Sequence, residues 1–571
     1  MRPITDQCTR RFAGICLAVG AVSILYILHH TGYPHPPYLL WITEYFLRTQ
    51  DVSGSALLMA LVVAALFTPT RPAALRFVEA LYRHPWHTAA VTFVLLCLGT
   101  LLIERNHPLP QDEYAALFQS RVFAAGRLTG EFPPDLLARL VPPHYLNQFL
   151  YGSLETGQVA SSYWPGFALL LTPFTFLNAP WACNPLLASL ALVLMARLAE
   201  RLSAAPQAGG WAMLLALASP AFTAMAITYF SMTAHLLLNL AFVWLLLEPS
   251  RARLVLAGAV GSAALVLHNP VPHALFALPW IVWLARQPLA LRNLAALAAG
   301  YAPLAVVLGL SWSILLSRLH GEAFSALYPS DGDPLHAAAN FAWNWHVKVL
   351  SVLVWPDANL LAARLAEYVR LWGWAVPGLP LLAAVGWWLA RADARAWLLG
   401  LSFIATLLGY LLVVYPQGHG WGARYLHSAW GALPVLAALA LVRLPGTRCE
   451  RIAGYVAALA LLSLVFASAL RAAQIREYLD AHLAKRPPLL PSEPQVVFVR
   501  ATPWDYNADL VQNDPFLRGD VLVLLSYGAD SDAQLMRRRF PGARLAHDDV
   551  RGQVWLLQRR SSNREPSGDT R

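Results

Sequence analysis

Apolar runs long enough to cross a lipid bilayer return about thirteen times along this chain of 571 residues. Only 13% of the residues are charged, against about 25% in a typical soluble domain, and the mean hydropathy is +0.48. We therefore interpret the chain as an integral membrane protein. This composition excludes a purely water-soluble enzyme, a disulfide scaffold and extended disorder.

The expected membrane helices follow directly from these runs. They lie near residues 13–28, 52–69, 88–103, 185–198, 211–228, 232–247, 254–267, 271–284, 294–316, 372–389, 396–414, 426–442 and 452–470. The first run follows Arg2, Arg10 and Arg11, and no small-residue cleavage site comes after it, so we expect an uncleaved anchor. Residues 167–177 are also apolar. We place them beside the membrane or re-entering it, because a crossing there would turn most arginine-rich loops outward.

The positive-inside rule then gives the orientation of the chain. It predicts a cytoplasmic N-terminus and three large segments on the opposite face: residues 104–184, residues 317–370 and everything after Arg471. The Ala, Leu and Arg usage is typical of a GC-rich bacterial genome, so we expect the bacterial inner membrane, with these segments in the periplasm. The net charge of +10 reflects this topology and gives no reason to expect a nucleic-acid partner.

The expected fold class is an all-α polytopic membrane protein with a small extracytoplasmic α/β domain at its C-terminal end. The expected parts are an N-terminal transmembrane hairpin (1–86), a main membrane region (87–470), the α/β domain (471–560) and a disordered tail (561–571). In the α/β domain we predict strands at Gln495–Arg500, Asp520–Tyr527 and Gln553–Gln558, and a helix at Asp532–Phe540.

The outer segment 104–184 begins with polar residues placed directly after a span. Asp112, Glu113 and Tyr114 open an expected helix over residues 115–125, which closes on Gly126. An adjacent acidic pair at a helix start can be an N-terminal cap favoured by the helix dipole. A pair just outside a span is also a candidate for function, because ionisable groups are costly within the membrane. This motif alone leaves both interpretations open.

Two further motifs make the pattern more specific. Tyr163-Trp164-Pro165-Gly166 leads into an apolar helix that ends in Pro173-Phe174, and Gly422-Ala423-Arg424-Tyr425-Leu426 precedes a late span. Together with the acidic pair, these motifs resemble the GT-C glycosyltransferase superfamily. The resemblance is closest to the polyprenyl-phosphate-sugar-dependent branch, which includes protein O-mannosyltransferases and aminoarabinose transferases of lipid A.

The resemblance covers roughly residues 88–470, and the chain departs from it in two places. Residues 1–86 are an addition to the usual plan. Where many relatives have Arg-Pro at an outer helix turn, this chain has His268-Asn269-Pro270.

This resemblance implies an activity and a set of site residues. The expected reaction moves a sugar from a polyprenyl-phosphate carrier to a lipid, glycan or protein acceptor at the periplasmic face, normally with inversion. Asp112 is then the base that takes the acceptor proton, and Glu113 orients it or binds the acceptor. Arg424 is the expected cation that stabilises the departing phosphate, and Lys348 is a weaker candidate for this role. The other expected substrate contacts are Tyr425, Tyr163, Trp164 and His268.

A geometric expectation follows from these roles. The Asp112 carboxylate and the Arg424 guanidinium should face one outer cavity, within roughly 10 Å of each other.

Each of these residues also has a plainer interpretation. Arg424 could anchor a helix end, Lys348 could extend along the membrane interface, and Tyr163 and Trp164 could belong to the interfacial aromatic belt. The resemblance implies no cofactor. A divalent metal remains an alternative, because several polar groups lie near outer helix ends or in an outer loop: His268, His273, His419, His427 and the Asp331-Gly332-Asp333 turn.

Two other functions remain possible on the sequence. One is a transporter or flippase of lipid-linked glycans, and the other is a non-catalytic scaffold of the cell envelope. Transport predicts ionisable residues near the middle of spans, whereas most of them lie at helix ends here.

Overall fold

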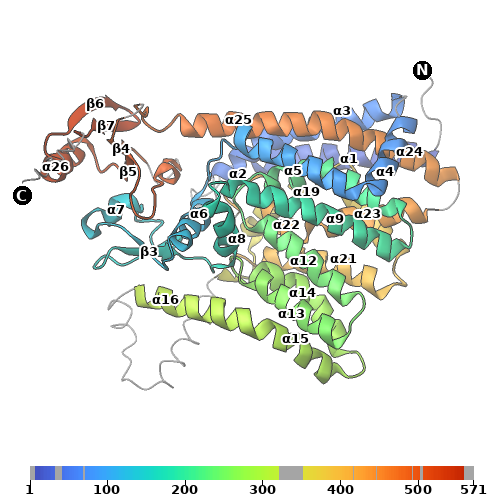
Figure 1. Ribbon diagram of the computed structural model, residues 1–571. Coiled ribbons are helices and arrows are strands. Elements are labelled where there is room, and N and C mark those ends of the chain that lie inside the picture. The colour runs from blue at the N-terminus through green and yellow to red at the C-terminus, as the bar shows by residue number, and fades with distance from the viewer. Residues whose placement is uncertain are drawn as a thin grey trace, which may run out of the picture.

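The computed structural model describes residues 7–32, 41–68, 71–319, 352–415, 417–444, 447–490, 493–501 and 506–558. A bundle of helices makes up most of the molecule, and two small sheets lie together at one end of it (Figure 1). The expected fold class, an all-α polytopic region with a small α/β domain, is confirmed. The expected disordered tail lies outside the described residues.

Seven helices in the described ranges are long and apolar enough to cross a membrane: Gln7–His30, Ile42–Phe67, Pro85–Leu102, Pro180–Ser203, Ala290–Leu319, Ala394–Leu411 and Arg451–Leu483. Two bent pairs raise this number to nine: Gln207–Leu217 with Pro220–Ala226 at 69°, and Arg424–Trp430 with Ala432–Arg443 at 49°. Four apolar helices are shorter: Gly166–Phe176, Met232–Leu246, Val271–Ala285 and Leu379–Leu389. The expected count of about thirteen is therefore not confirmed, because breaks shorten several apolar runs.

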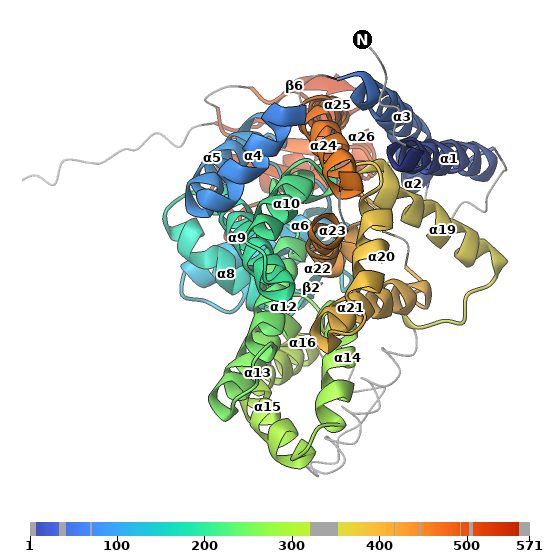
Figure 2. The same cartoon turned by 90° about the vertical axis from the view of Figure 1, so that its right-hand side faces the viewer.

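The helices of the bundle have the following bounds: α1 (Gln7–His30), α2 (Trp41–Phe46), α3 (Val52–Phe67), α4 (Arg71–Arg83), α5 (Pro85–Leu102), α9 (Cys183–Ser203), α10 (Gln207–Leu217), α11 (Pro220–Ala226), α12 (Met232–Leu246), α13 (Arg251–Leu265), α14 (Val271–Ala285), α15 (Ala290–Leu304), α16 (Ser311–Leu319), α19 (Ala358–Gly373), α20 (Leu379–Leu389), α21 (Ala394–Leu411), α22 (His427–Trp430), α23 (Ala432–Arg443), α24 (Thr447–Leu462) and α25 (Ser468–Leu483). In the end-on view, α1 and α3 lie near α19 and α24, while α13, α14 and α15 form a group on the opposite side (Figure 2).

The last helix differs from the sequence expectation. The expected span ended near residue 470, whereas α24 continues through a π-helical turn into α25, which ends only at Leu483. This long helix runs along the bundle as far as the C-terminal domain (Figure 1). Arg471 lies inside the helix and is buried, so it is a packing residue of the bundle.

A buried charge cluster joins the N-terminal helices to the rest of the bundle. The Asp51 carboxylate accepts hydrogen bonds from Arg370 Nε at 2.8 Å and Trp374 Nε1 at 2.6 Å, and Arg471 Nη2 lies 3.2 Å away. These three charged side chains are almost completely buried. Isolated charges are costly inside an apolar bundle, so Asp51 offsets two cations that would otherwise lack a counter-charge. Residues 1–86 are thus an integral part of the bundle where they are described.

The outer segment between α5 and α9 contains three α-helices and a small sheet. Its elements are α6 (Gln111–Ala124), β1 (Gly130–Glu131), α7 (Leu137–Leu140), β2 (Leu150–Gly152), β3 (Gln158–Ser161) and α8 (Gly166–Phe176). β3 is the central strand and pairs antiparallel with β1 and β2.

The C-terminal domain is a four-stranded sheet with one helix. Its elements are β4 (Gln495–Val499), β5 (Val521–Leu525), α26 (Ala529–Arg539), β6 (Arg544–Asp549) and β7 (Gly552–Leu556), in the strand order β5-β4-β7-β6. β4 pairs parallel with β5 and antiparallel with β7. The three predicted strands and the predicted helix are confirmed. The sequence analysis did not predict β6. Its residues are mostly polar, and most of its side chains are exposed, so it lacks a buried apolar run.

The C-terminal domain and the outer segment share one hydrophobic core. Tyr114 and Phe118 of α6 pack in the same buried cluster as Val496 and Phe498 of β4 and Leu524 of β5. At the same interface, Arg139 donates to the Asp532 carboxylate at 2.5 Å in a buried ion pair. The domain is therefore fixed against the helix that carries the acidic pair.

The Asp51 cluster predicts that a substitution that keeps the shape of Asp51 but removes its charge strongly lowers the stability of the protein. Replacing Asp51 with Asn leaves Arg370 and Arg471 buried without a counter-charge, which costs about 3–5 kcal/mol when a buried pair is broken from one side. We expect a clearly lower thermal unfolding midpoint of the purified protein in detergent. Glu79→Gln is the control, because it breaks a solvent-exposed pair with Arg83 and should leave the midpoint nearly unchanged. Equal midpoints for the two variants would contradict the role of Asp51.

Candidate active site

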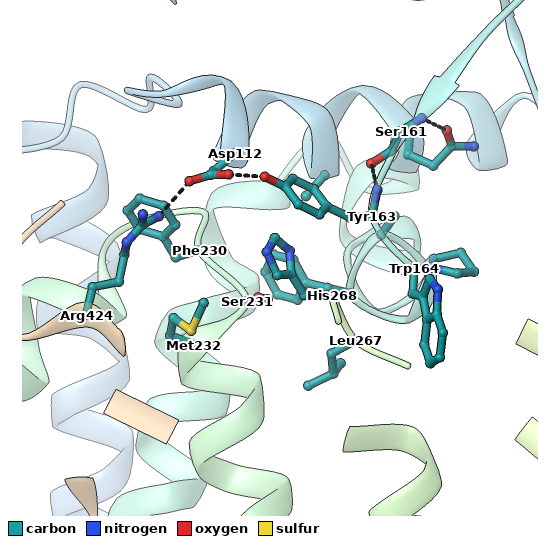
Figure 3. Close-up of a pocket in the computed structure, with 15 residues that line it drawn as sticks. Asp112, Ser161, Tyr163, Trp164, Phe230, Ser231, Met232, Leu267, His268 and Arg424 are labelled. Carbon is teal, nitrogen blue, oxygen red and sulfur yellow. Dashed lines mark hydrogen bonds and ion pairs between the residues drawn. The ribbon is translucent and has the colours of Figure 1, made fainter. Parts of the chain in front are cut away.

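A pocket lies where the outer segment meets the ends of the bundle helices (Figure 3). Its walls come from the start of α6, the segment between β3 and α8, the loops before α12 and α14, and the start of the helix pair α22–α23. The lining residues are Asp112, Ala116, Gln119, Ser161, Tyr163, Trp164, Pro165, Phe167, Ala168, Phe230, Ser231, Met232, Leu267, His268 and Arg424. Five of the eight side chains assigned to the site by sequence therefore meet at one pocket.

Asp112 and Arg424 are in direct contact at the edge of this pocket. Arg424 Nη1 donates to Asp112 Oδ2 at 2.8 Å, and the Tyr163 hydroxyl donates to Asp112 Oδ1 (Figure 3). The Asp112 side chain is 18% exposed and that of Arg424 only 6%. The two groups therefore line one pocket and lie well within the expected 10 Å of each other. Because Arg424 is buried and paired with a carboxylate, it does more than anchor a helix end.

The acidic pair does not cap its helix through its side chains. Pro110 is the N-cap of α6, and no side chain makes a capping hydrogen bond there. Both Asp112 oxygens accept hydrogen bonds from other parts of the chain. The positive end of the α6 dipole still stabilises a negative charge at this place.

The Tyr163-Trp164-Pro165-Gly166 motif fixes the far wall of the pocket. The amides of Trp164, Gly166 and Phe167 donate to the carbonyls of His268, Val266 and Leu267, each at 3.0 Å. A Cβ atom on Gly166 would lie 2.6 Å from the Val266 carbonyl oxygen, so this close approach requires glycine. These backbone contacts bring the rings of Tyr163 and His268 together, with their centroids 3.7 Å apart.

A glycine-rich loop presents Arg424 to the pocket. Gly418, Gly420 and Gly422 have φ angles of +65°, +128° and +60°, which other residues rarely adopt. Gln417 closes the loop on itself: its side-chain oxygen accepts from the Arg424 amide at 2.8 Å, and its carbonyl accepts from Arg424 Nη2. The Gln417 amide in turn donates to Glu367 of α19 at 2.9 Å. The loop conformation thus fixes both the backbone and the guanidinium of Arg424.

The electrostatics of the pocket favour a charged Asp112 beside a charged Arg424 and a neutral Tyr163 and His268. Burial alone would raise the pKa of Asp112, but the charge of Arg424, the nearby His268 and the Tyr163 hydroxyl lower it below its ordinary value. Burial and the adjacent carboxylate raise the pKa of Tyr163 well above its ordinary value, so this hydroxyl keeps its proton. Burial lowers the pKa of His268 to about 4, so its imidazole is neutral near pH 7.

Glu113 points away from the pocket. Its carboxylate accepts a hydrogen bond from the Tyr229 amide at 3.0 Å, and the side chain is buried. Burial, together with the nearby Glu104 carboxyl, raises the pKa of Glu113 well above its ordinary value. Glu104 accepts a hydrogen bond from Trp421 Nε1, and burial raises its pKa to about 8. Burial therefore disfavours a negative charge on both glutamates.

The remaining expected site residues have different positions. Tyr425 is not among the pocket residues, and its ring stacks on Tyr410 with centroids 4.8 Å apart. Trp164 lines the pocket on the side away from Arg424 (Figure 3). Lys348 and the Asp331-Gly332-Asp333 turn lie outside the described residues. Within the described ranges, no three His, Cys, Asp or Glu side chains gather in a way that could bind a metal ion.

Several pocket residues escaped the sequence analysis. Phe230, Ser231 and Met232 line the pocket at the start of α12, and the Arg424 guanidinium lies over the Phe230 ring, 4.3 Å from its centroid. Their sequence is apolar or small and gives no separate signal. Gln417 had one available signal, because three glycines alternate with other residues directly after it.

Comparison with known proteins gives little beyond these residues. No protein-family model matches the chain, and no curated protein matches it. Two crystal structures of ArnT from Cupriavidus metallidurans, one bound to undecaprenyl phosphate and one in the apo state, are similar to it at 14% identity and a TM-score of 0.49. The match with the bound structure covers 83% of this chain and 98% of the ArnT chain. The match with the apo structure covers 82% of this chain and 97% of the ArnT chain. At this TM-score the similarity decides neither fold nor activity, so an assignment has to come from the residues.

The Arg424 contact makes a prediction that needs no substrate. In Arg424→Gln, Asp112 loses the neighbouring positive charge, so its pKa should rise toward or above its ordinary value. We expect the infrared band of the protonated Asp112 carboxyl to appear at higher pH than in the native protein during acid titration. The spectrum of Asp112→Asn identifies this band by its absence. A band that titrates at the native pH in Arg424→Gln would show that the pair does not form.

Proposed function

We propose that this chain is a GT-C-type membrane glycosyltransferase, which moves a sugar from a polyprenyl-phosphate donor to an acceptor at the periplasmic face of the inner membrane. The observation that carries the proposal is the Asp112–Arg424 contact in a pocket at the ends of apolar helices. A base and a phosphate-binding cation are the two charges that this reaction needs, and here they lie side by side.

The reaction uses these residues in one displacement step. Asp112 accepts the proton of the acceptor hydroxyl while the acceptor oxygen forms a bond to the anomeric carbon of the sugar. The bond from that carbon to the phosphate oxygen breaks on the opposite side, and its electron pair leaves with the lipid phosphate. The anomeric configuration is inverted. A low pKa suits Asp112 for this role only partly, since it keeps the base charged but makes it weaker.

Arg424 is proposed to stabilise the negative charge on the leaving phosphate. Its side chain lines the pocket, and its buried Nε atom has no hydrogen-bond partner among the described residues, so the guanidinium is not fully paired within the protein. When a phosphate takes up part of the Arg424 charge, Asp112 loses some of its stabilisation and becomes a stronger base. Donor binding would therefore prepare Asp112 for proton transfer.

The other pocket residues have supporting roles in this proposal. The Tyr163 hydroxyl orients Asp112, and Trp164 offers an aromatic face to a sugar. Neutral His268 can donate or accept a hydrogen bond at the pocket wall. Glu113, whose carboxyl faces Tyr229, is proposed to fix the start of α6 and not to contact substrate.

Two variants of adjacent residues test the assignment of the base. We expect Asp112→Asn to lower transfer by about 10²–10⁴-fold, the range for loss of a general base. Glu113→Gln should retain most of the activity, because Glu113 faces the Tyr229 amide outside the pocket and the Gln side-chain oxygen can accept the same hydrogen bond. The measurement is transfer of radiolabelled sugar from a panel of undecaprenyl-phosphate sugars by purified protein in lipid.

The same panel separates the enzyme from its alternatives. Donor consumption by the native protein that disappears in Asp112→Asn supports the transferase and names the sugar. No turnover of any donor, with donor binding that survives the substitution, would contradict it and favour a transporter or a scaffold.

We propose Arg424, and not a metal ion, as the positive charge at the phosphate. Transfer should then continue at an unchanged rate in excess EDTA. A loss of transfer that added Mg²⁺ or Mn²⁺ restores would assign this role to a metal.

A further inference from the structure

The C-terminal domain contacts both halves of the candidate active site. Asp112 and Arg424 are 312 positions apart in the chain, and they lie on separate elements, α6 and the glycine-rich loop 417–424. One short stretch of the C-terminal domain, residues 509–513, reaches both elements. We refer to it as the bridging segment.

The bridging segment binds the start of α6 on both sides of Asp112. The Tyr114 hydroxyl donates to the Asn513 carbonyl at 2.7 Å and accepts from the Asn513 amide at 2.9 Å. On the other side of Asp112, Gln111 Nε2 donates to the Asp509 carbonyl at 3.4 Å. These contacts are buried, so water does not compete for them. They fix where α6 begins and therefore where Asp112 lies.

The same segment binds the loop that carries Arg424. Asp509 Oδ2 lies 3.1 Å from His419 Nδ1, and both side chains are almost fully buried. With the proton on Nδ1, His419 Nε2 accepts a hydrogen bond from the Tyr478 hydroxyl of α25 at 2.7 Å. His419 stands between Gly418 and Gly420, so the backbone on either side of it has positive φ angles. Such a loop has many alternative conformations, and the Asp509 contact selects one of them.

The bridging segment is itself fixed to the sheet of its domain. The Asn513 side chain donates to the Val523 carbonyl at 2.8 Å and accepts from the Val523 amide at 2.9 Å. The Asn513 side chain thereby makes the two hydrogen bonds that a residue of a neighbouring strand would make with β5. A displacement of Asp509 would have to move this edge of the sheet, so the segment can transmit the position of the domain to the site.

We propose that the C-terminal domain sets the distance between Asp112 and Arg424, with Asp509 as a positioning residue. The inference rests on the proposed function and adds a role for a domain that touches no reacting atom. A misplacement of about 1 Å far from the chemistry can cost on the order of 10² in rate. Loss of the Asp509 carboxylate releases the loop at His419, and the geometry of the base and the cation is then no longer fixed.

Two variants remove this contact from opposite sides, and a third is a matched control. Asp509→Ala removes the carboxylate but leaves its backbone contact to Gln111. His419→Phe retains a ring in the same packing and removes both hydrogen bonds. Asp135→Ala is the control, because Asp135 also pairs across the domain interface, with Arg539 at 2.5 Å, but in a partly exposed place outside the pocket.

We expect kcat for sugar transfer at saturating donor to fall by about 10- to 100-fold in Asp509→Ala and in His419→Phe. Both variants remove a buried contact, so their thermal midpoints should fall, and kcat is compared at a temperature at which every variant is folded. Asp135→Ala should have the native kcat. If Asp509→Ala does not fold, His419→Phe alone decides. A native kcat in the folded variants, or a lower midpoint without a change of kcat, would overturn the inference.

Amide hydrogen exchange separates this inference from the proposed function. Faster exchange in residues 111–116 and in 417–424, in both variants and not in Asp135→Ala, supports the bridging role even if the native protein transfers no sugar. In that case the proposed function is wrong, and the positioning role of the bridging segment is still supported. Unchanged exchange in both regions overturns the bridge, whatever the native protein catalyses.

Discussion

The buried contact between Asp112 and Arg424 is the constraint on which the arrangement of the pocket depends. Neither charge is stable in this place alone, because little water reaches it, so each requires the other. The contact obliges the start of α6 and the loop 417–424 to meet, although they are far apart in sequence. The Tyr163-Trp164-Pro165-Gly166 segment completes the site, since the Tyr163 hydroxyl satisfies the second Asp112 oxygen.

The loop 417–424 is where the separate parts of the molecule converge. Glycines alternate with larger residues in this loop, and several of these residues contact different elements. The Gln417 backbone amide donates to Glu367 of α19, the His419 ring contacts Asp509 of the C-terminal domain, Trp421 donates to Glu104 after α5, and Arg424 binds Asp112. The N-terminal helices also take part, because Arg370, which pairs with Asp51, donates to the Gly422 carbonyl at 3.4 Å. Glycine makes this possible, since it permits the turns that send successive side chains in different directions.

The sequence predicts the positions of most helices and of the main site residues, but not the contacts between distant segments. Apolar runs identify most bundle helices because burial and lipid contact require them, and the motifs place Asp112, Tyr163 and Arg424 at one site. Helix breaks depend on single residues such as Pro220, which begins the second helix of a bent pair, and the expected count of spans is therefore not confirmed. The exposed strand β6 has no apolar pattern to reveal it.

Residues such as Asp509 and Gln417 act through contacts between distant segments, which no local pattern encodes. Glu113 illustrates the same limit. It adjoins Asp112 in sequence, but the helical turn directs its side chain toward Tyr229 and away from the pocket.

Asp112 and Arg424 are far apart in the sequence, so the ribosome synthesises them at different times. A ribosome adds about 5–20 residues per second, so about 16–60 s pass between the synthesis of Asp112 and that of Arg424. The bridging segment is translated later still. During this interval α6 has neither its counter-charge nor the domain that covers Tyr114 and Phe118. The nascent segment between α5 and α9 therefore exposes an apolar surface until the C-terminal domain covers it, and the arrangement around Asp112 can form only after that domain has been synthesised.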